Sequence, residues 1–319
     1  MTGRAAILLT IALALHAPAG PMAAQVAPAS GASLKLTGYL QPRFQGLGDS
    51  ATFLLRRARF AAEGRINSWA SFRAQVEMRT IGAAATPPAS PLTLSATDLF
   101  IRLSHKRWVG TVGQFRVPFS LESLLSSTIL ETSERSRVVF AARRDIGAQV
   151  EWGIPERLAL QGAIVNGDGP NRASNPDNRM AYLVRAVLTP VPGLDVGGAF
   201  EGYADSTGLD LQGRYQGERW RVRAEALQTR RRATSVRSSG WYALAAVLVH
   251  PPRLQLVGRV EQFDPSDQVD TDRLTGYSIG TQYFIQGDNL KVLADYEVIR
   301  EQATQLDNDR MVVQLQVRW

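Results

Sequence analysis

The chain has 319 residues and a formal net charge of +7, with no cysteine and three histidines. The lack of cysteine excludes disulfides and thiolate metal sites, and three scattered histidines make a multi-histidine metal site improbable. The composition therefore indicates no metal and no cofactor, and the length suits two ordinary domains or one large barrel.

Residues 1–24 have the features of a secretory signal peptide. Met1–Arg4 is positively charged, Ala5–Leu15 is apolar, and small residues follow as far as Ala24. We expect cleavage near Ala24, with Ala19 as a second candidate site. The alternative, a membrane anchor, would need roughly 20 apolar residues. Residues 25–32 then form a short N-terminal segment, and 33–319 form a single domain.

From residue 33 onward, polar and apolar residues alternate with the period of a β-strand, and a helical period is almost absent. The pattern predicts sixteen strands, of which Trp69–Ile81 is the clearest. The others are Leu34–Gln45, Phe53–Ile66, Ser95–His105, Trp108–Arg116, Gly147–Trp152, Arg157–Val165, Arg179–Thr189, Leu194–Gly202, Leu209–Tyr215, the strand containing Arg219–Arg223, Trp241–Val249, Leu254–Phe263, Leu274–Ile285, Leu290–Ile299 and Arg310–Trp319.

The connections between these strands alternate between long and short. Short ones such as Asn67-Ser68 and Gly287–Asn289 have turn chemistry, and long ones include Gly82–Leu94, Val117–Asp145 and Thr229–Gly240. This alternation is typical of an outer-membrane β-barrel, which has short periplasmic turns and longer external loops. The last strand ends on an aromatic residue, Trp319, as outer-membrane assembly signals usually do.

A barrel of sixteen strands encloses a water-filled lumen, so we expect the polar faces to point inward and the apolar faces to contact outer-membrane lipid. Arginine dominates the polar faces. Arg219, Arg221 and Arg223 alternate with apolar residues and form a ladder with steps of about 7 Å. Arg56 is an exception, because it falls on the apolar face. The candidate anion-binding residues are Arg57, Arg59, Arg73, Arg116, Arg185, Arg219, Arg221, Arg223 and Arg259.

Rings of arginine select anions in pores, and the planar guanidinium fork matches phosphate oxygens. The pattern therefore predicts a passive, anion-selective channel. The alternative is a general porin in which the arginines merely pair with acidic residues. Taken alone, the ladder also fits a solvated strand face of a soluble sandwich, such as an exported adhesin.

Other function classes find less support. A barrel-borne hydrolase needs a nucleophile beside a base, whereas His105 and His250 fall in predicted short turns. Nucleic-acid binding needs aromatic residues on the basic face, but here they lie mainly on the opposite face. The segment Gly167–Asn178 has the oxygen-bearing residues of a calcium loop without the spacing of an EF-hand, which favours a plain external loop.

Several short motifs resemble the phosphate-selective porin O and P family. They are Val112–Glu122 (VGQFRVPFSLE), Leu55–Arg59 (LRRAR), Ala142–Gly147 (ARRDIG) and Val165–Gly167 (VNG), in the order found in that family. The resemblance implies a sixteen-stranded, trimeric barrel of the bacterial outer membrane that conducts phosphate or polyphosphate.

The resemblance also implies that the third loop, Leu121–Arg144, folds inward as the constriction, with an acidic residue, Asp98, nearby. The constriction-loop residues would be Glu122, Ser126, Ser127, Arg135, Arg137, Arg143 and Arg144. The chain is short for the family and has few lysines, so phosphate specificity and plain anion preference both stay open.

Overall fold

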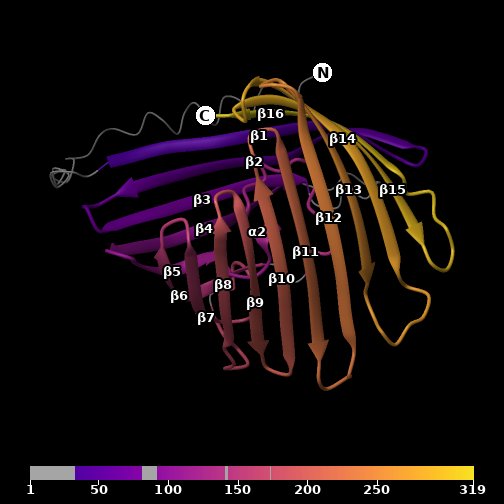
Figure 1. The fold of residues 1–319 in the computed structure, drawn as a ribbon. Helices are drawn as coiled ribbons and strands as arrows, with labels where there is room; N and C mark the ends of the chain where they lie inside the picture. The colour runs from indigo at the N-terminus through magenta and orange to yellow at the C-terminus, as the bar shows by residue number, and fades with distance from the viewer. Residues whose placement is uncertain (1–32, 81–91, 141–142, 173) are drawn as a thin grey trace, which may run out of the picture.

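In the computed structural model, the chain forms a closed barrel of sixteen antiparallel strands, each paired with its neighbours in sequence (Figure 1). The structure describes residues 33–80, 92–140, 143–172 and 174–319. The predicted signal peptide lies outside these residues. The ring closes where β1 pairs with β16, in a register that joins Tyr39 to Arg318 and Leu47 to Arg310. The predicted fold class is confirmed.

The strand bounds agree with the predicted ones to within a few residues at most ends, and the fifth strand agrees at both. The strands are β1 Ser33–Leu47, β2 Ser50–Arg65, β3 Ala70–Thr80, β4 Leu92–His105, β5 Trp108–Arg116, β6 Arg144–Ile154, β7 Leu158–Val165, β8 Ala181–Val191, β9 Leu194–Tyr203, β10 Ser206–Gln216, β11 Trp220–Arg231, β12 Arg237–His250, β13 Leu254–Asp264, β14 Leu274–Gln286, β15 Leu290–Glu301 and β16 Arg310–Arg318.

Successive side chains of each strand point alternately into and out of the barrel. In β16, Gln314 and Gln316 are buried in the interior, whereas Val313 and Leu315 are about 40% exposed on the outer face. An apolar outer face removes the need to desolvate polar side chains in hydrocarbon, and closure pairs every strand edge. The same alternation gives the interior its polar character.

Long and short connections alternate around most of the ring, so the barrel has a short-turn end and a long-loop end. Two connections at the long-loop end depart from the prediction. β1 and β2 are joined by the tight turn Gly48-Asp49, and β9 and β10 by Ala204-Asp205. The expected long loop at 229–240 is also mostly strand, because β11 and β12 extend to Arg231 and from Arg237.

A bulge in β2, with Arg56 as its extra residue, changes which arginines reach the interior. The register between β1 and β2 shifts between Gln41 and Pro42, where proline has no N–H to give to the ladder. Consequently, adjacent residues Arg56 and Arg57 both contact the same interior carboxylate, that of Glu134. The prediction that Arg56 lies on the apolar outer face is therefore wrong.

Residues 117–143 connect β5 and β6, and the described part of this connection lies inside the ring and contains the short helix α2, Leu121–Leu124 (Figure 1). Ser120 caps α2, its hydroxyl accepting a hydrogen bond from the Ser123 amide at 3.3 Å. Val117, Phe119 and Val138 of this loop join an apolar cluster with residues of the walls. These wall residues are Phe115, Ala163, Val165, Ala181, Leu183, Ala199, Leu227, Tyr242, Leu244, Ala246 and Val257. This cluster explains why β12 is apolar on both faces.

No helix among the described residues is long and apolar enough to cross a membrane.

Candidate functional site

The loop 117–143 is tied to the walls by hydrogen bonds along its length. Ser127 lies 2.6 Å from the Tyr39 hydroxyl, measured from its Oγ. Wall glutamines donate to loop carbonyls, Gln316 to Thr128 at 3.0 Å and Gln282 to Leu130 at 2.7 Å. These partners lie on β1, β14 and β16. The loop therefore has a defined path across the interior.

Loop carboxylates bind several of the wall arginines that the sequence singled out. Arg223 of the predicted ladder is buried between Glu122, at 3.0 Å, and Glu131, at 2.9 Å. Arg57 contacts Glu134 at 2.8 Å. Burial disfavours ionisation of Glu134, but the guanidiniums of Arg57 and its neighbours outweigh burial and hold the pKa of this carboxyl well below its ordinary value.

Other predicted wall arginines pair with carboxylates of the walls themselves. Arg59 binds Glu77 at 2.8 Å. Asp98 lies between Arg144, at 2.7 Å, and Arg73, at 3.3 Å. These two neighbours show that Asp98 neutralises arginines beside the loop.

The same pairing holds on β13 and β15. Arg259 contacts Glu261 at 3.1 Å and Glu297 at 3.5 Å. The loop residue Arg137 binds the same two carboxylates at 2.8 and 2.6 Å. Arg143, at the end of the loop, contacts Asp145 at 3.3 Å and also binds Glu201.

Among the candidate arginines, three lie inside the barrel with no carboxylate of the described residues at ion-pair distance. Arg116 donates to the carbonyls of Ser123, Leu124 and Leu125 at 2.6–3.0 Å. Arg135 donates to the carbonyls of Glu122 and Leu125 at 3.0 and 2.6 Å. Arg185 donates to Gln161 and Gln212 at 3.0 and 2.9 Å. Neutral acceptors orient all three guanidiniums, so no direct ion pair within the described residues neutralises their charges.

Each of these three arginines lines a different cavity. Arg135 lines a cavity of about 410 Å³ near the long-loop end, together with Leu47 and Asn308. Arg116 lines one of about 720 Å³ that reaches Asn289 and Trp319 at the short-turn end.

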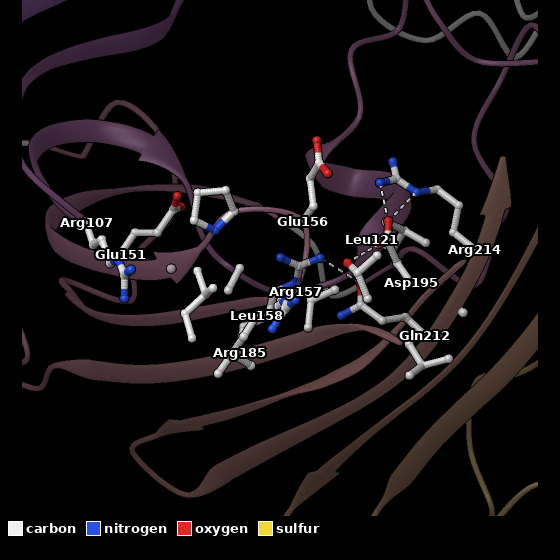
Figure 2. A pocket seen from close by; sticks show the side chains of 18 residues that line it. Arg107, Leu121, Glu151, Glu156, Arg157, Leu158, Arg185, Asp195, Gln212 and Arg214 are labelled. Atoms are coloured by element: carbon white, nitrogen blue, oxygen red, sulfur yellow. Dashed lines mark hydrogen bonds and ion pairs between the residues drawn. The ribbon is translucent and has the colours of Figure 1, made fainter. Parts of the chain in front are cut away.

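Arg185 lines the third cavity, of about 450 Å³, beside the β6–β7 turn (Figure 2). In Figure 2, Arg185 lies beside Gln212, and the ion pair of Arg214 with Asp195 lies next to them. Residues of the loop 117–143 line all three cavities, so the loop separates the first from the other two.

The remaining candidate residues lie at the margins of these contacts. Arg221 is one-third exposed, and its guanidinium is 4.0 Å from Glu131. Arg219 lies in the turn before β11 and is exposed, so the structure does not join it to the other two ladder residues. The Ser126 hydroxyl bonds to Thr128 within the loop and lines the cavity of Arg116.

Sequence reasoning missed Glu131 and Glu134, the loop carboxylates that neutralise wall arginines. Their partners lie far away in the chain, at positions such as Arg43 and Arg223. A usable indication was present, because a loop predicted to enter an arginine-lined lumen carries acidic residues that need positive partners.

A closed antiparallel barrel with an apolar outer face and a polar, charged interior defines a transmembrane β-barrel of the outer-membrane class. The sequence model of the family described as "phosphate-selective porin O and P" matches residues 37–226 and 205–319. The chain belongs to this family, and it is a channel-forming protein of the bacterial outer membrane rather than a typical enzyme.

Solved structures of bacterial outer-membrane proteins share the fold. The channel DcaP of Acinetobacter baumannii has a TM-score of 0.69 at 9% identity, covering 91% of this chain and 98% of that one. An anion-selective porin from Comamonas acidovorans scores 0.67 at 11%, covering 90% and 100%. The trimer form of OmpT from Vibrio cholerae scores 0.66 at 11%, covering 90% and 99%. No functionally curated protein matches the sequence.

Proposed function

We propose that the protein is a passive, anion-selective channel that admits small inorganic anions and favours phosphate. The observation that carries this proposal is that Arg135, Arg116 and Arg185, which line three different interior cavities, form no ion pair with a carboxylate in the part of the chain that the structure describes. An arginine paired with a carboxylate presents little net charge to a passing ion, whereas an unpaired one attracts anions. Neutral acceptors hold these three in place without cancelling their charge.

The three unpaired arginines give a permeating anion successive positive positions along the interior. Each is a single charge at the edge of a cavity, which suits a position that an anion can enter and leave. Arginine also fits the geometry of phosphate oxygens better than lysine does. The family description, "phosphate-selective", supports the same preference.

The remaining expectations about the mature protein form part of this proposal. The signal peptide 1–24 directs export, the long-loop end faces the outside, and the short-turn end faces the periplasm. The loop 117–143 is the constriction. A homotrimer fits the trimeric form of OmpT among the similar structures.

The proposal is tested by the zero-current potential of the purified protein in a planar bilayer under a KCl gradient, then with phosphate added. We expect anion selectivity and a phosphate block of the chloride current. Arg135→Ala should lower the anion-to-cation permeability ratio by about fivefold, since one unit charge near an ion is worth roughly 1 kcal/mol in a wet site.

Arg253→Ala is the control, because Arg253 is exposed in the β12–β13 turn, and its ratio should match the wild type. Cation selectivity in the wild type would contradict the proposal.

A general, nonspecific porin is the second candidate. It is favoured by the number of interior arginines that pair with carboxylates, such as Arg59, Arg223 and Arg259. In that case, the same bilayer experiment would give a zero-current potential close to zero and no block by phosphate.

A further inference from the structure

The carboxylate of Glu134 is surrounded by three guanidiniums from β1 and β2. Arg43 and Arg57 each approach one of its oxygens at 2.8 Å, and Arg56 contacts both oxygens, at 2.5 and 3.1 Å. Two of these side chains, Arg43 and Arg57, are almost completely buried. One negative charge thus faces three positive charges, which leaves an excess of positive charge around a small monoanion.

Two guanidiniums of this cluster, those of Arg43 and Arg57, have other partners that hold them in position. Arg43 donates to the side-chain oxygen of Gln314 at 2.7 Å, and Arg57 donates to that of Gln41 at 3.2 Å. These acceptors are neutral and belong to the barrel wall. The barrel wall therefore holds Arg43 and Arg57 in position independently of Glu134, which reaches them from the loop.

The cluster opens onto the cavity near the long-loop end. The side chain of Glu134 is 14% exposed and that of Arg56 is 22% exposed. Both line the cavity of about 410 Å³, together with Arg135 and Arg310. An anion in this cavity would lie beside Arg56 and Glu134, and it would reach Arg43 and Arg57 behind them once the Glu134 carboxylate is displaced.

We infer that Arg43, Arg56 and Arg57 form an oxyanion site, and that Glu134 is a tethered carboxylate that competes with a permeating phosphate for it. This inference rests on the proposed function. A phosphate ion brings more oxygens and more charge than a carboxylate, so it suits three guanidinium forks better. Competition from Glu134 weakens phosphate binding and lets the ion leave, which conduction requires.

The loop does not depend on Glu134 alone for its position. Beyond the bonds of Ser127, Thr128 and Leu130 to the walls, the Ser133 amide donates to Asp295 on β15. Removing the Glu134 charge should therefore free the arginines while the loop stays in place.

The test measures block of the KCl current by inorganic phosphate in planar bilayers, with the full-length mature protein. Glu134→Gln should lower the phosphate concentration for half-block by about tenfold. Without a competing carboxylate, phosphate gains roughly the strength of one hydrogen bond to a charged group, and that difference corresponds to about a tenfold change in affinity. Glu134→Asp keeps the carboxylate and should lie between the wild type and Glu134→Gln.

Glu63→Gln is the matched control. Glu63 is a glutamate of the barrel wall rather than of the loop, and it binds Arg73 and lines the cavity at the short-turn end. The same charge is thus removed away from the three arginines, and half-block should change little. Adding Arg56→Gln to Glu134→Gln should return half-block towards the wild-type value.

The outcomes separate the two proposals. A wild type without anion preference refutes the proposed function. An anion-selective wild type with equal half-block in Glu134→Gln, or an equal gain in Glu63→Gln, refutes the oxyanion site alone. A folded barrel is recognised by a gel band whose mobility changes on heating. If Glu134→Gln lacks this band, the test uses Glu134→Asp and Arg56→Gln instead. Arg56→Gln alone should raise the phosphate concentration for half-block, and an unchanged half-block in both variants refutes the site.

Discussion

Arginine supplies most of the positive charge of the barrel interior, and the partners of each arginine decide its effect. Arg223 and Arg185 both point inward from neighbouring parts of the wall. Arg223 is buried between two loop carboxylates, whereas Arg185 lies between two glutamine side chains and lines a cavity. The first holds the loop in place, and the second presents a charge to the lumen.

Arg223→Ala should therefore lower the stability of the barrel, whereas Arg185→Ala should lower its anion selectivity. Loss of Arg223 leaves Glu122 and Glu131 buried without this partner, and breaking a buried ion pair costs about 3–5 kcal/mol. The urea concentration at which half of the Arg223→Ala protein loses the heat-modifiable gel band of the folded barrel should therefore fall. Arg185→Ala should keep the midpoint and lower anion selectivity in bilayers. A lower selectivity in Arg223→Ala at unchanged stability would contradict this assignment.

Individual strands and turns depend on glycines at a few close approaches. Gly113 of β5, within the motif that resembles the family, has a φ of +124°, and a Cβ there would lie 2.2 Å from the carbonyl oxygen of Leu99. Side chains rarely adopt such a φ, and the clash is with backbone, which cannot move aside. The glycine is thus required for the pairing of β4 with β5.

Gly113→Ala should destabilise the barrel by at least about 2 kcal/mol, from backbone strain together with the clash. The urea midpoint of the heat-modifiable band measures this loss. Gly162→Ala is the control, because Gly162 also lies within a strand and a Cβ there meets nothing within 4 Å. Equal midpoints in the two variants would show that Gly113 is not constrained.

At the scale of the whole molecule, the barrel depends on the joint between its first and last strands. Gly38 and Trp319 exchange backbone hydrogen bonds of 3.2 and 3.1 Å across this joint. The Trp319 ring lies over Gly38, and its centroid is 5.9 Å from that of Phe60 on β2. The ring therefore covers the joint from β16 to β2.

Trp319→Ala keeps the backbone bonds and removes the ring contact, which should cost about 1–2 kcal/mol of barrel stability. Refolding yield in detergent and the urea midpoint should both fall. Trp220→Ala is the comparison, since Trp220 is similarly exposed and has no aromatic ring partner among the described residues. A loss as large in Trp220→Ala would assign the effect to lipid contact instead.

The barrel was predictable from the sequence because lipid on one face and a polar interior on the other impose a period of two on most of its strands. Trp108–Arg116 has the same bounds in prediction and structure. Local departures were not predictable in this way. Arg56 turns inward because of a bulge, and Arg219 falls in a turn one residue before its strand.

The candidate site was predictable only in part. Residue type and period identified the interior arginines, but the partner of each one depends on the path of the loop 117–143. Glu134 meets Arg43 and Arg57 across long separations in sequence, which no periodic pattern encodes. For the same reason, the distinction between paired and unpaired arginines, on which the proposed selectivity rests, needed the structure.

The loop bonds also have a mechanical consequence. Through Glu134 and Glu122 the loop joins β2 to β11, which lie nearly across the ring from each other. A loop bound at both ends by these ion pairs holds the two walls at a fixed distance, so it resists flattening of the barrel when the surrounding membrane is stretched or thinned. The conductance of the wild type should therefore change little between bilayers of different thickness. The conductance of Arg223→Ala, which lacks the ion pairs of the loop with β11, should vary with bilayer thickness.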